Sequence, residues 1–140
     1  MKSRPNIGLS GEQQFVVEEK HVVEFAGDGM PAVLSTPQLI GWLERTARLA
    51  LAPLLEPNER TVGVEIDLRH LAPTPLGARV TCVTRVVAVD GQVVTLQVEA
   101  RDGMETLARG LHRRAVIRLD SFSRRLVRKA AALAAPSPGS

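Results

Sequence analysis

The sequence predicts a single α+β domain in which a curled antiparallel sheet wraps around one long helix. Residues 37–52 carry apolar side chains at helical spacing, and later segments alternate apolar and polar residues as half-buried strands do. One amphipathic helix needs a sheet to cover its apolar side, because an isolated helix cannot bury it. With 140 residues, 44% of them hydrophobic, the chain is long enough to build one core, so we expect one domain over residues 1–140.

The predicted helix begins at Thr36-Pro37. Proline is favoured at the first helical position, so Thr36 is expected to be the N-cap residue. The stripe expected to face the core comprises Leu39, Ile40, Leu43, Thr46, Ala47, Ala50 and Leu51. Glu44 borders this stripe and does not lie on the fully polar side, and Pro53 ends the helix.

Strands are predicted on both sides of this helix. Residues 13–17 and 21–25 are expected to form short strands before it. After it, residues 62–70 alternate in hydropathy, which places His70 on the apolar face with Val62 and Val64. Three further strands are predicted over residues 79–89, 92–101 and 105–119. The dipeptides Asp90-Gly91 and Asp102-Gly103 between them are typical hairpin turns.

The charge is divided unevenly along the chain. The net charge of +3 combines a basic region, residues 109–140, with an acidic region, residues 1–108. A basic helix is expected over residues 121–134, capped by Ser121 or Ser123, followed by a flexible tail over residues 135–140. A basic segment of this kind is either a solvated helix face or a surface that meets phosphates.

The composition excludes several classes of site. A single cysteine, Cys82, excludes a disulfide framework and a multi-cysteine zinc site, and its alternation with apolar neighbours indicates a core residue. His21 and His112 have no convincing metal-binding partners, so we expect no metal and no cofactor. Aromatic residues make up only 3% of the chain, which disfavours single-stranded nucleic acid as a ligand.

The chain shows no predicted targeting signal or membrane span. The N-terminus lacks the apolar segment of a secretory leader. The longest aliphatic stretch, residues 49–55, contains Pro53 and is far too short to cross a bilayer. With one thiol as well, these features lead us to expect a cytoplasmic protein without a membrane partner.

Residues 34–119 resemble the hotdog thioesterases related to fluoroacetyl-CoA thioesterase. The resemblance rests on an ordered series of short motifs: Ser35-Thr36-Pro37, Leu43-Glu44-Arg45, the exit sequence of residues 51–57, Gly63, Arg69-His70-Leu71, residues 73–77 and His112-Arg113-Arg114. The hotdog fold is also the architecture that the helix and strand patterns predict.

The resemblance implies a catalytic group and an assembly. Thr36, Glu44 and His70 match the catalytic residues of that family, which lie at a dimer interface. The backbone N–H of Gly63 is expected to meet the acyl carbonyl, and Arg114 matches an arginine beside the site. The family's lid phenylalanines are missing here, because no aromatic residue follows Phe25 in the loop before Thr36. Fluoroacetyl selectivity is therefore not expected to transfer.

The expected chemistry is hydrolysis of a small or medium acyl-CoA thioester. His70, with an ordinary pKa near 6.5, can act as general base on Thr36 or on water, while Glu44 orients its ring. The amides of Gln38, Leu39 and Gly63 are candidate donors to the oxyanion.

Each residue also has a plainer interpretation: Thr36 as a helix cap, Glu44 as a solvated position and His70 as a strand-end residue. The alternative functions are an acyl-CoA-binding or sensing protein without catalysis and, third, a nucleic-acid-binding protein that uses its basic C-terminal segment. In an acyl-CoA enzyme, part of that segment is available to the phosphates of CoA.

Overall fold

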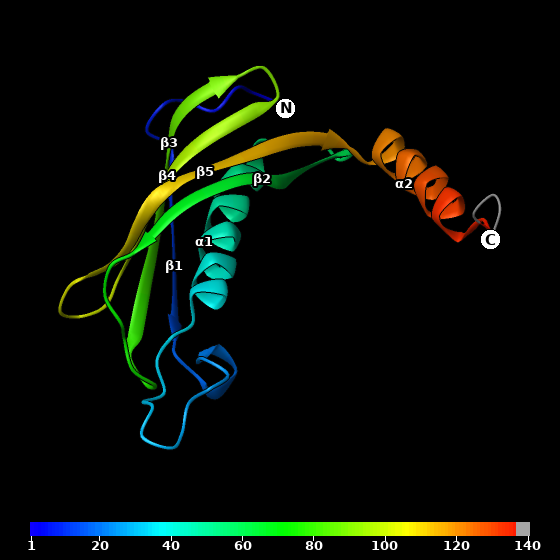
Figure 1. The fold of residues 1–140 in the computed structure, drawn as a ribbon. Coiled ribbons are helices and arrows are strands. Elements are labelled where there is room, and N and C mark those ends of the chain that lie inside the picture. The colour runs from blue at the N-terminus through cyan, green and yellow to red at the C-terminus, as the bar shows by residue number, and fades with distance from the viewer. Residues whose placement is uncertain (137–140) are drawn as a thin grey trace.

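The computed structural model describes residues 1–136 and contains a five-stranded antiparallel sheet of order β1-β3-β4-β5-β2 (Figure 1). The strands are β1 (Ser10–Val16), β2 (Glu59–His70), β3 (Arg79–Asp90), β4 (Val93–Arg101) and β5 (Thr106–Arg118). The α-helices are α1 (Thr36–Leu51) and α2 (Leu119–Ala134), and two 3-10 helices cover Glu19–His21 and Ala52–Leu54. The predicted α+β architecture is confirmed. Most of the predicted tail, residues 137–140, lies outside the described part of the chain.

Helix α1 lies against the curved sheet and supplies one side of the core (Figure 1). Leu39, Leu43 and Ala47 are fully buried, as the helical spacing predicts. Cys82 on β3 is also fully buried, and burial raises the pKa of its thiol to about 12. Cys82 is therefore a core residue and not a thiolate nucleophile.

The predicted strand over residues 21–25 does not form. His21 ends a 3-10 turn, and its Nδ1 accepts a hydrogen bond of 2.9 Å from the Glu18 backbone N–H. The His21 ring is buried and meets Phe15 edge-on, with the ring centroids 5.2 Å apart. The prediction from the short alternating pattern was wrong here. A local 3-10 turn supplies hydrogen bonds to this backbone and directs the His21 side chain into the core.

The cap of α1 lies one residue before the predicted position. Ser35 is the N-cap, and its Oγ accepts from the Gln38 backbone N–H at 3.4 Å. Thr36 is the first helical residue, with Pro37 after it. The capping role predicted for Thr36 is therefore wrong, and the shift leaves the Thr36 hydroxyl available for another partner.

Strand β2 contains a bulge that the alternation did not predict. Its register with β5 shifts between Gly63 and Glu65, and Val64 is 55% exposed. An extra residue in one strand reverses which side chains face the core, so Thr61 is buried where Val62 was expected. Beyond the bulge, His70 still faces inward and is half-buried.

Helix α2 leaves the sheet at the end of β5 and extends away from it (Figure 1). Its predicted serine caps are wrong: Arg118 is the N-cap residue and makes no side-chain cap hydrogen bond. The start of the helix is held instead by a 2.9 Å hydrogen bond from the Leu119 N–H to the Asn58 carbonyl. No helix within residues 1–136 is long and apolar enough to span a membrane.

Candidate active site

The structure brings Thr36 and His70 together. Thr36 Oγ1 lies 2.8 Å from His70 Nδ1. The hydroxyl comes from the first residue of α1 and the imidazole from the last residue of β2. A cavity of about 290 Å³ opens beside the pair, lined by Val33, Leu34, Thr36, His70, Leu71, Ala72 and Pro73. A hydroxyl hydrogen-bonded to an imidazole is the arrangement in which the imidazole can remove the hydroxyl proton.

Burial favours the neutral form of the His70 ring. Loss of hydration lowers the pKa of His70, and the nearby backbone of Ala72 opposes this only in part. For Nδ1 to accept the Thr36 proton, the ring hydrogen must lie on Nε2. Nε2 is buried and has no hydrogen-bond partner among the described residues. The far side of the ring therefore lacks the acceptor that a buried N–H requires.

Glu44 does not contact His70 within one chain. It lies eight residues after Thr36 on the same helix, about 12 Å along the axis. Its Oε2 is 3.7 Å from Arg114 Nη1, and its side chain is 43% exposed. The structure thus places Glu44 with Arg114, apart from the Thr36–His70 pair.

Arg114 is buried in a network of hydrogen bonds on β2 and β5. Its Nε donates to Thr61 Oγ1 at 3.0 Å, and its Nη2 donates to the Thr61 carbonyl at 2.9 Å. Burial lowers the pKa of Arg114, while the nearby Glu44 carboxylate acts in the opposite direction. A buried cation of this kind needs a carboxylate close by, which explains why Glu44 borders the apolar stripe of α1.

His112 belongs to the same network. Its Nδ1 lies 2.9 Å from the Glu65 carbonyl, and its Nε2 lies 3.2 Å from Arg114 Nη1. The ring therefore donates through Nδ1 and accepts through Nε2, and burial lowers its pKa. With both nitrogens occupied, His112 positions Arg114. The sequence analysis missed this role, although a spacing of two residues on one strand puts both side chains on the same face.

Gly63 allows the Glu44 carboxylate to approach β2. A Cβ at position 63 would lie 2.6 Å from Glu44 Oε2 and 3.2 Å from His112 Cε1. Gly63 and Glu44 line a second cavity of about 270 Å³, together with Val64, Glu65, Ile66 and His112. The predicted site residues thus fall into two groups: Thr36 with His70, and Glu44 with Gly63 and Arg114.

The two candidate oxyanion donors on α1 are already engaged. Ser35 accepts from the Gln38 N–H through its side chain, at 3.4 Å, and from the Leu39 N–H through its carbonyl, at 3.1 Å. Of the three predicted donors, Gly63 remains. No group of three His, Cys, Asp or Glu side chains in residues 1–136 is arranged to hold a metal ion.

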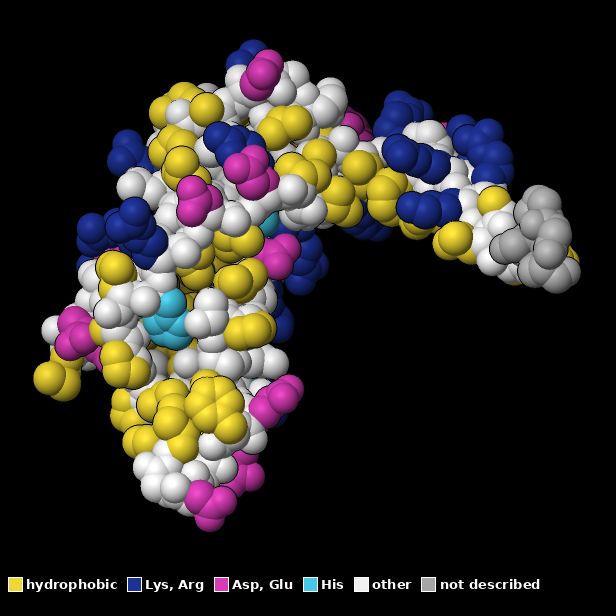
Figure 2. All heavy atoms as spheres, viewed as in Figure 1, with side chains coloured by type: hydrophobic (Ala, Val, Ile, Leu, Met, Phe, Trp, Pro, Cys, Tyr) yellow, Lys and Arg dark blue, Asp and Glu magenta, His cyan; other side chains and the backbone are white. Residues whose placement is uncertain are grey.

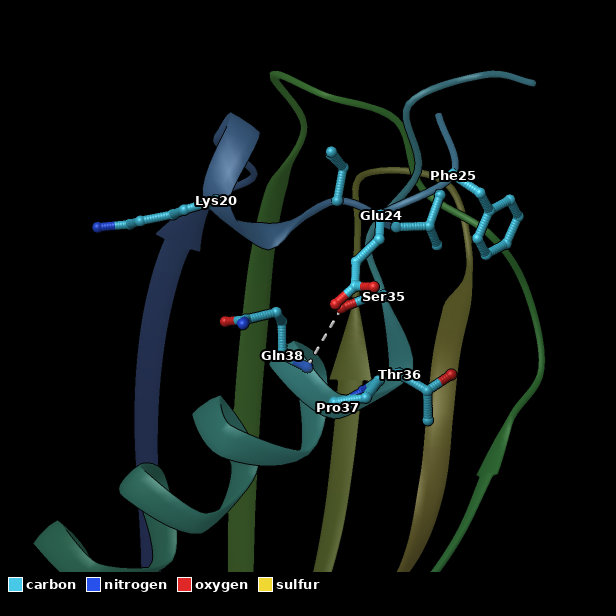
Figure 3. A pocket seen from close by; sticks show the side chains of 9 residues that line it. Lys20, Glu24, Phe25, Ser35, Thr36, Pro37 and Gln38 are labelled. Atoms are coloured by element: carbon cyan, nitrogen blue, oxygen red, sulfur yellow. Dashed lines mark hydrogen bonds between the residues drawn. The ribbon is translucent and has the colours of Figure 1, made fainter. Parts of the chain in front are cut away.

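A third cavity, of about 500 Å³, reaches Thr36 from the preceding loop (Figure 3). Its lining comprises Lys20, Val22, Val23, Glu24, Phe25, Ser35, Thr36, Pro37 and Gln38. Phe25 is 68% exposed and does not close over Thr36. The loop therefore leaves open space beside Thr36.

Comparison with known proteins identifies the family. The profile of the fluoroacetyl-CoA-specific thioesterases matches residues 17–120. The fluoroacetyl-CoA thioesterase of Streptantibioticus cattleyicolor is 34% identical over 137 residues, covering 92% of this chain and 97% of that protein. The chain belongs to this thioesterase family. Membership confirms the predicted enzyme class, a thioester hydrolase.

Solved structures agree with this family and with the hotdog fold. A crystal structure of a mutant fluoroacetyl-CoA-specific thioesterase superposes with a TM-score of 0.83 at 33% identity, covering 91% of this chain and 99% of that one. A thioesterase superfamily member from Thermus thermophilus superposes with a TM-score of 0.81 at 26% identity, covering 93% of this chain and 99% of that one.

Proposed function

We propose that this thioesterase hydrolyses a small or medium acyl-CoA to the free acid and CoA, with His70 as general base. The observation that carries the proposal is the 2.8 Å contact between Thr36 Oγ1 and the half-buried His70 ring, whose pKa is lowered by burial. In one route His70 takes the Thr36 proton while Oγ1 attacks the thioester carbon. In the other, Thr36 positions a water that His70 deprotonates.

In both routes His70 carries one proton from the nucleophile to the leaving group. When the tetrahedral intermediate collapses, the carbon–sulfur bond breaks and the proton held on His70 goes to the departing thiolate of CoA. In the Thr36 route a water then repeats the cycle on the acyl-threonine, and the proton finally returns to Thr36. A negative charge develops on the former carbonyl oxygen in each tetrahedral intermediate, and the Gly63 N–H is the proposed donor to it.

A second copy of the chain supplies the missing contacts in this proposal. β2 is an edge strand of 12 residues that carries both Gly63 and His70. Edge strands of this length readily pair with another chain. In an antiparallel β2–β2 pair, Gly63 and Glu44 of one copy approach His70 of the other. Glu44 then provides the acceptor that the buried Nε2–H of His70 lacks within one chain.

The pH dependence of hydrolysis should report the neutral form of His70. Within one chain, burial lowers the pKa of His70. In the proposed dimer the Glu44 carboxylate of the second copy acts in the opposite direction, so we expect kcat/KM to fall at acid pH and this acid limb to move to lower pH in Glu44→Gln. Thioester absorbance measured from pH 5 to 8 provides the profile. An acid limb at the same pH in the wild type and in Glu44→Gln would contradict the contact between His70 and the Glu44 carboxylate.

The direct test is hydrolysis of a panel of acyl-CoAs: acetyl, fluoroacetyl, butyryl, hexanoyl, phenylacetyl and palmitoyl. We expect thiol release with the short and medium substrates, slower release from palmitoyl-CoA, and no preference for fluoroacetyl over acetyl, because Phe25 does not close over Thr36. Binding of these compounds without thiol release would show an acyl-CoA sensor instead.

A further inference from the structure

Helix α2 has no partner within its own chain. None of its 16 residues is buried, and its contacts with the rest of the chain are few and include the end of β5 and Asn58. A free helix of about 16 residues is only marginally stable in water, because tertiary packing supplies most helix stability. A surface that covers α2 is therefore missing from the single chain.

Val127 stands apart and is 69% exposed, while five other apolar side chains of α2 form one stripe. It comprises Leu119, Phe122, Leu126, Ala130 and Leu133, which follow the spacing of one helix face. Leu126 is 49% exposed and Leu133 is 77% exposed. The rest of the helix carries Arg124, Arg125, Arg128 and Lys129. Figure 2 shows α2 projecting from the rest of the molecule, with a hollow below it. Apolar side chains lie on the edge of α2 that borders this hollow.

The position of α2 is tied to one end of β2. Arg118 on β5 lies opposite Glu59 on β2 in the strand register, and the Leu119 N–H donates to the Asn58 carbonyl. In the antiparallel β2–β2 pair proposed above, the Glu59 end of one strand lies beside the His70 end of the other. The start of α2 therefore lies near the Thr36–His70 pair of the second copy.

That end of the molecule has a surface complementary to α2. Three large apolar residues are exposed there: Phe25 at 68%, Leu71 at 54% and Leu76 at 45%. Phe25 and Leu71 line the two cavities that meet at Thr36. The adjoining segment, residues 18–28, carries a net negative charge: Lys20 pairs with Glu18, and Glu19, Glu24 and Asp28 are the other acidic residues. An apolar stripe on a basic helix matches an apolar patch beside an acidic segment.

We propose that α2 docks on a second copy of this chain, with its apolar stripe on the surface formed by the partner's Phe25, the partner's Leu71 and the partner's Leu76. This inference rests on the dimer of the proposed function. Docked in this way, α2 covers the rim of the partner's active site, and Arg125 and Lys129, which flank the apolar stripe, are the basic residues nearest to the partner's acidic segment. A basic amphipathic helix is also typical of binding to an anionic membrane. The matching patch and opposite charge on the same chain favour the second copy.

The test compares two substitutions in the full chain that add the same charge. Leu126→Glu places a carboxylate in the apolar stripe, and Ala131→Glu places one on the opposite side of α2. Sedimentation velocity measures the dimer dissociation constant, and hydrogen exchange measures protection of residues 119–134, 22–30 and 71–77. We expect Leu126→Glu to weaken the dimer about tenfold or more and to deprotect all three segments. We expect Ala131→Glu to match the wild type.

Several results would overturn the docking. These are a monomeric wild type, equal dimer constants in both variants and the wild type, or α2 amides that exchange as fast as an unfolded peptide. Binding of the wild type to phosphatidylglycerol vesicles, lost in Leu126→Glu while the dimer constant stays unchanged, would assign the stripe to a membrane.

Acyl-CoA hydrolysis by the wild type is measured separately. A docked dimer without turnover contradicts only the proposed function, and turnover with an unprotected α2 contradicts only the docking.

Discussion

Replacing His70 with alanine is expected to lower kcat/KM for acyl-CoA hydrolysis by about 10²- to 10⁴-fold, the usual contribution of a positioned general base. The His70 Nδ1 atom lies 2.8 Å from Thr36 Oγ1, and burial lowers the pKa of the ring so that it is ready to accept a proton. Without the imidazole, neither Thr36 nor a water has a base within reach. Steady-state thiol release from a good substrate of the panel gives kcat/KM for the variant and the wild type.

The loss in the His70→Ala variant should not reflect unfolding. His70 ends β2 at the rim of a cavity and its Nε2 makes no hydrogen bond within residues 1–136, so its removal breaks few contacts. The midpoint of thermal unfolding should stay close to that of the wild type. Thr36→Ala should lower turnover about tenfold or more, for loss of the hydroxyl. Unchanged turnover in the His70 variant at unchanged stability would contradict the mechanism.

Replacing Glu44 with glutamine should lower hydrolysis about tenfold or more, because the amide keeps the shape of the carboxylate and loses its charge. The carboxylate is the proposed acceptor for the Nε2–H of His70 in the second copy. It is also the acidic group closest to the buried Arg114, at 3.7 Å. Arg114 keeps its two hydrogen bonds to Thr61 but loses its neutralising carboxylate, so we expect some loss of stability, and the midpoint of thermal unfolding is measured beside turnover.

A matched control for this variant lies on the same cavity. Glu65→Gln makes the same chemical change beside Gly63, where the Glu65 side chain pairs with the exposed Arg113 at 2.8 Å. Exposed pairs contribute little, so turnover in Glu65→Gln should match the wild type. Equal losses in the two variants would point to the general charge of the cavity and remove the specific role of Glu44.

Much of the fold could be predicted from local patterns. The helical stripe of α1 gave correct positions for Leu39 and Leu43, and alternation identified β3, β4 and β5. The errors arise where one residue changes the geometry. Ser35 takes the cap predicted for Thr36, and the bulge after Gly63 reverses the face of β2. Hydropathy does not report either event, because a cap depends on one hydrogen bond and a bulge on one unpaired residue.

The catalytic roles of Thr36, Glu44 and His70, which the order of motifs selects, stay predictions. The structure shows that Thr36 contacts His70. Eight residues on one helix already separate Thr36 from Glu44 by about two turns. The conclusion that Glu44 stands with Arg114, apart from His70, required the packing of α1 on β2 and β5. The role of His112 also appeared only with its two hydrogen bonds.

A mixed dimer tests the central claim that each active site combines Thr36 and His70 of one copy with Glu44 of the other. Glu44→Gln and His70→Ala chains with different affinity tags are expressed together, and the heterodimer is isolated through both tags. One of its two sites then holds only native residues, so its turnover per dimer should recover to about half that of the wild type. A heterodimer no more active than the two parent homodimers would contradict the shared site and place the whole catalytic group within one chain.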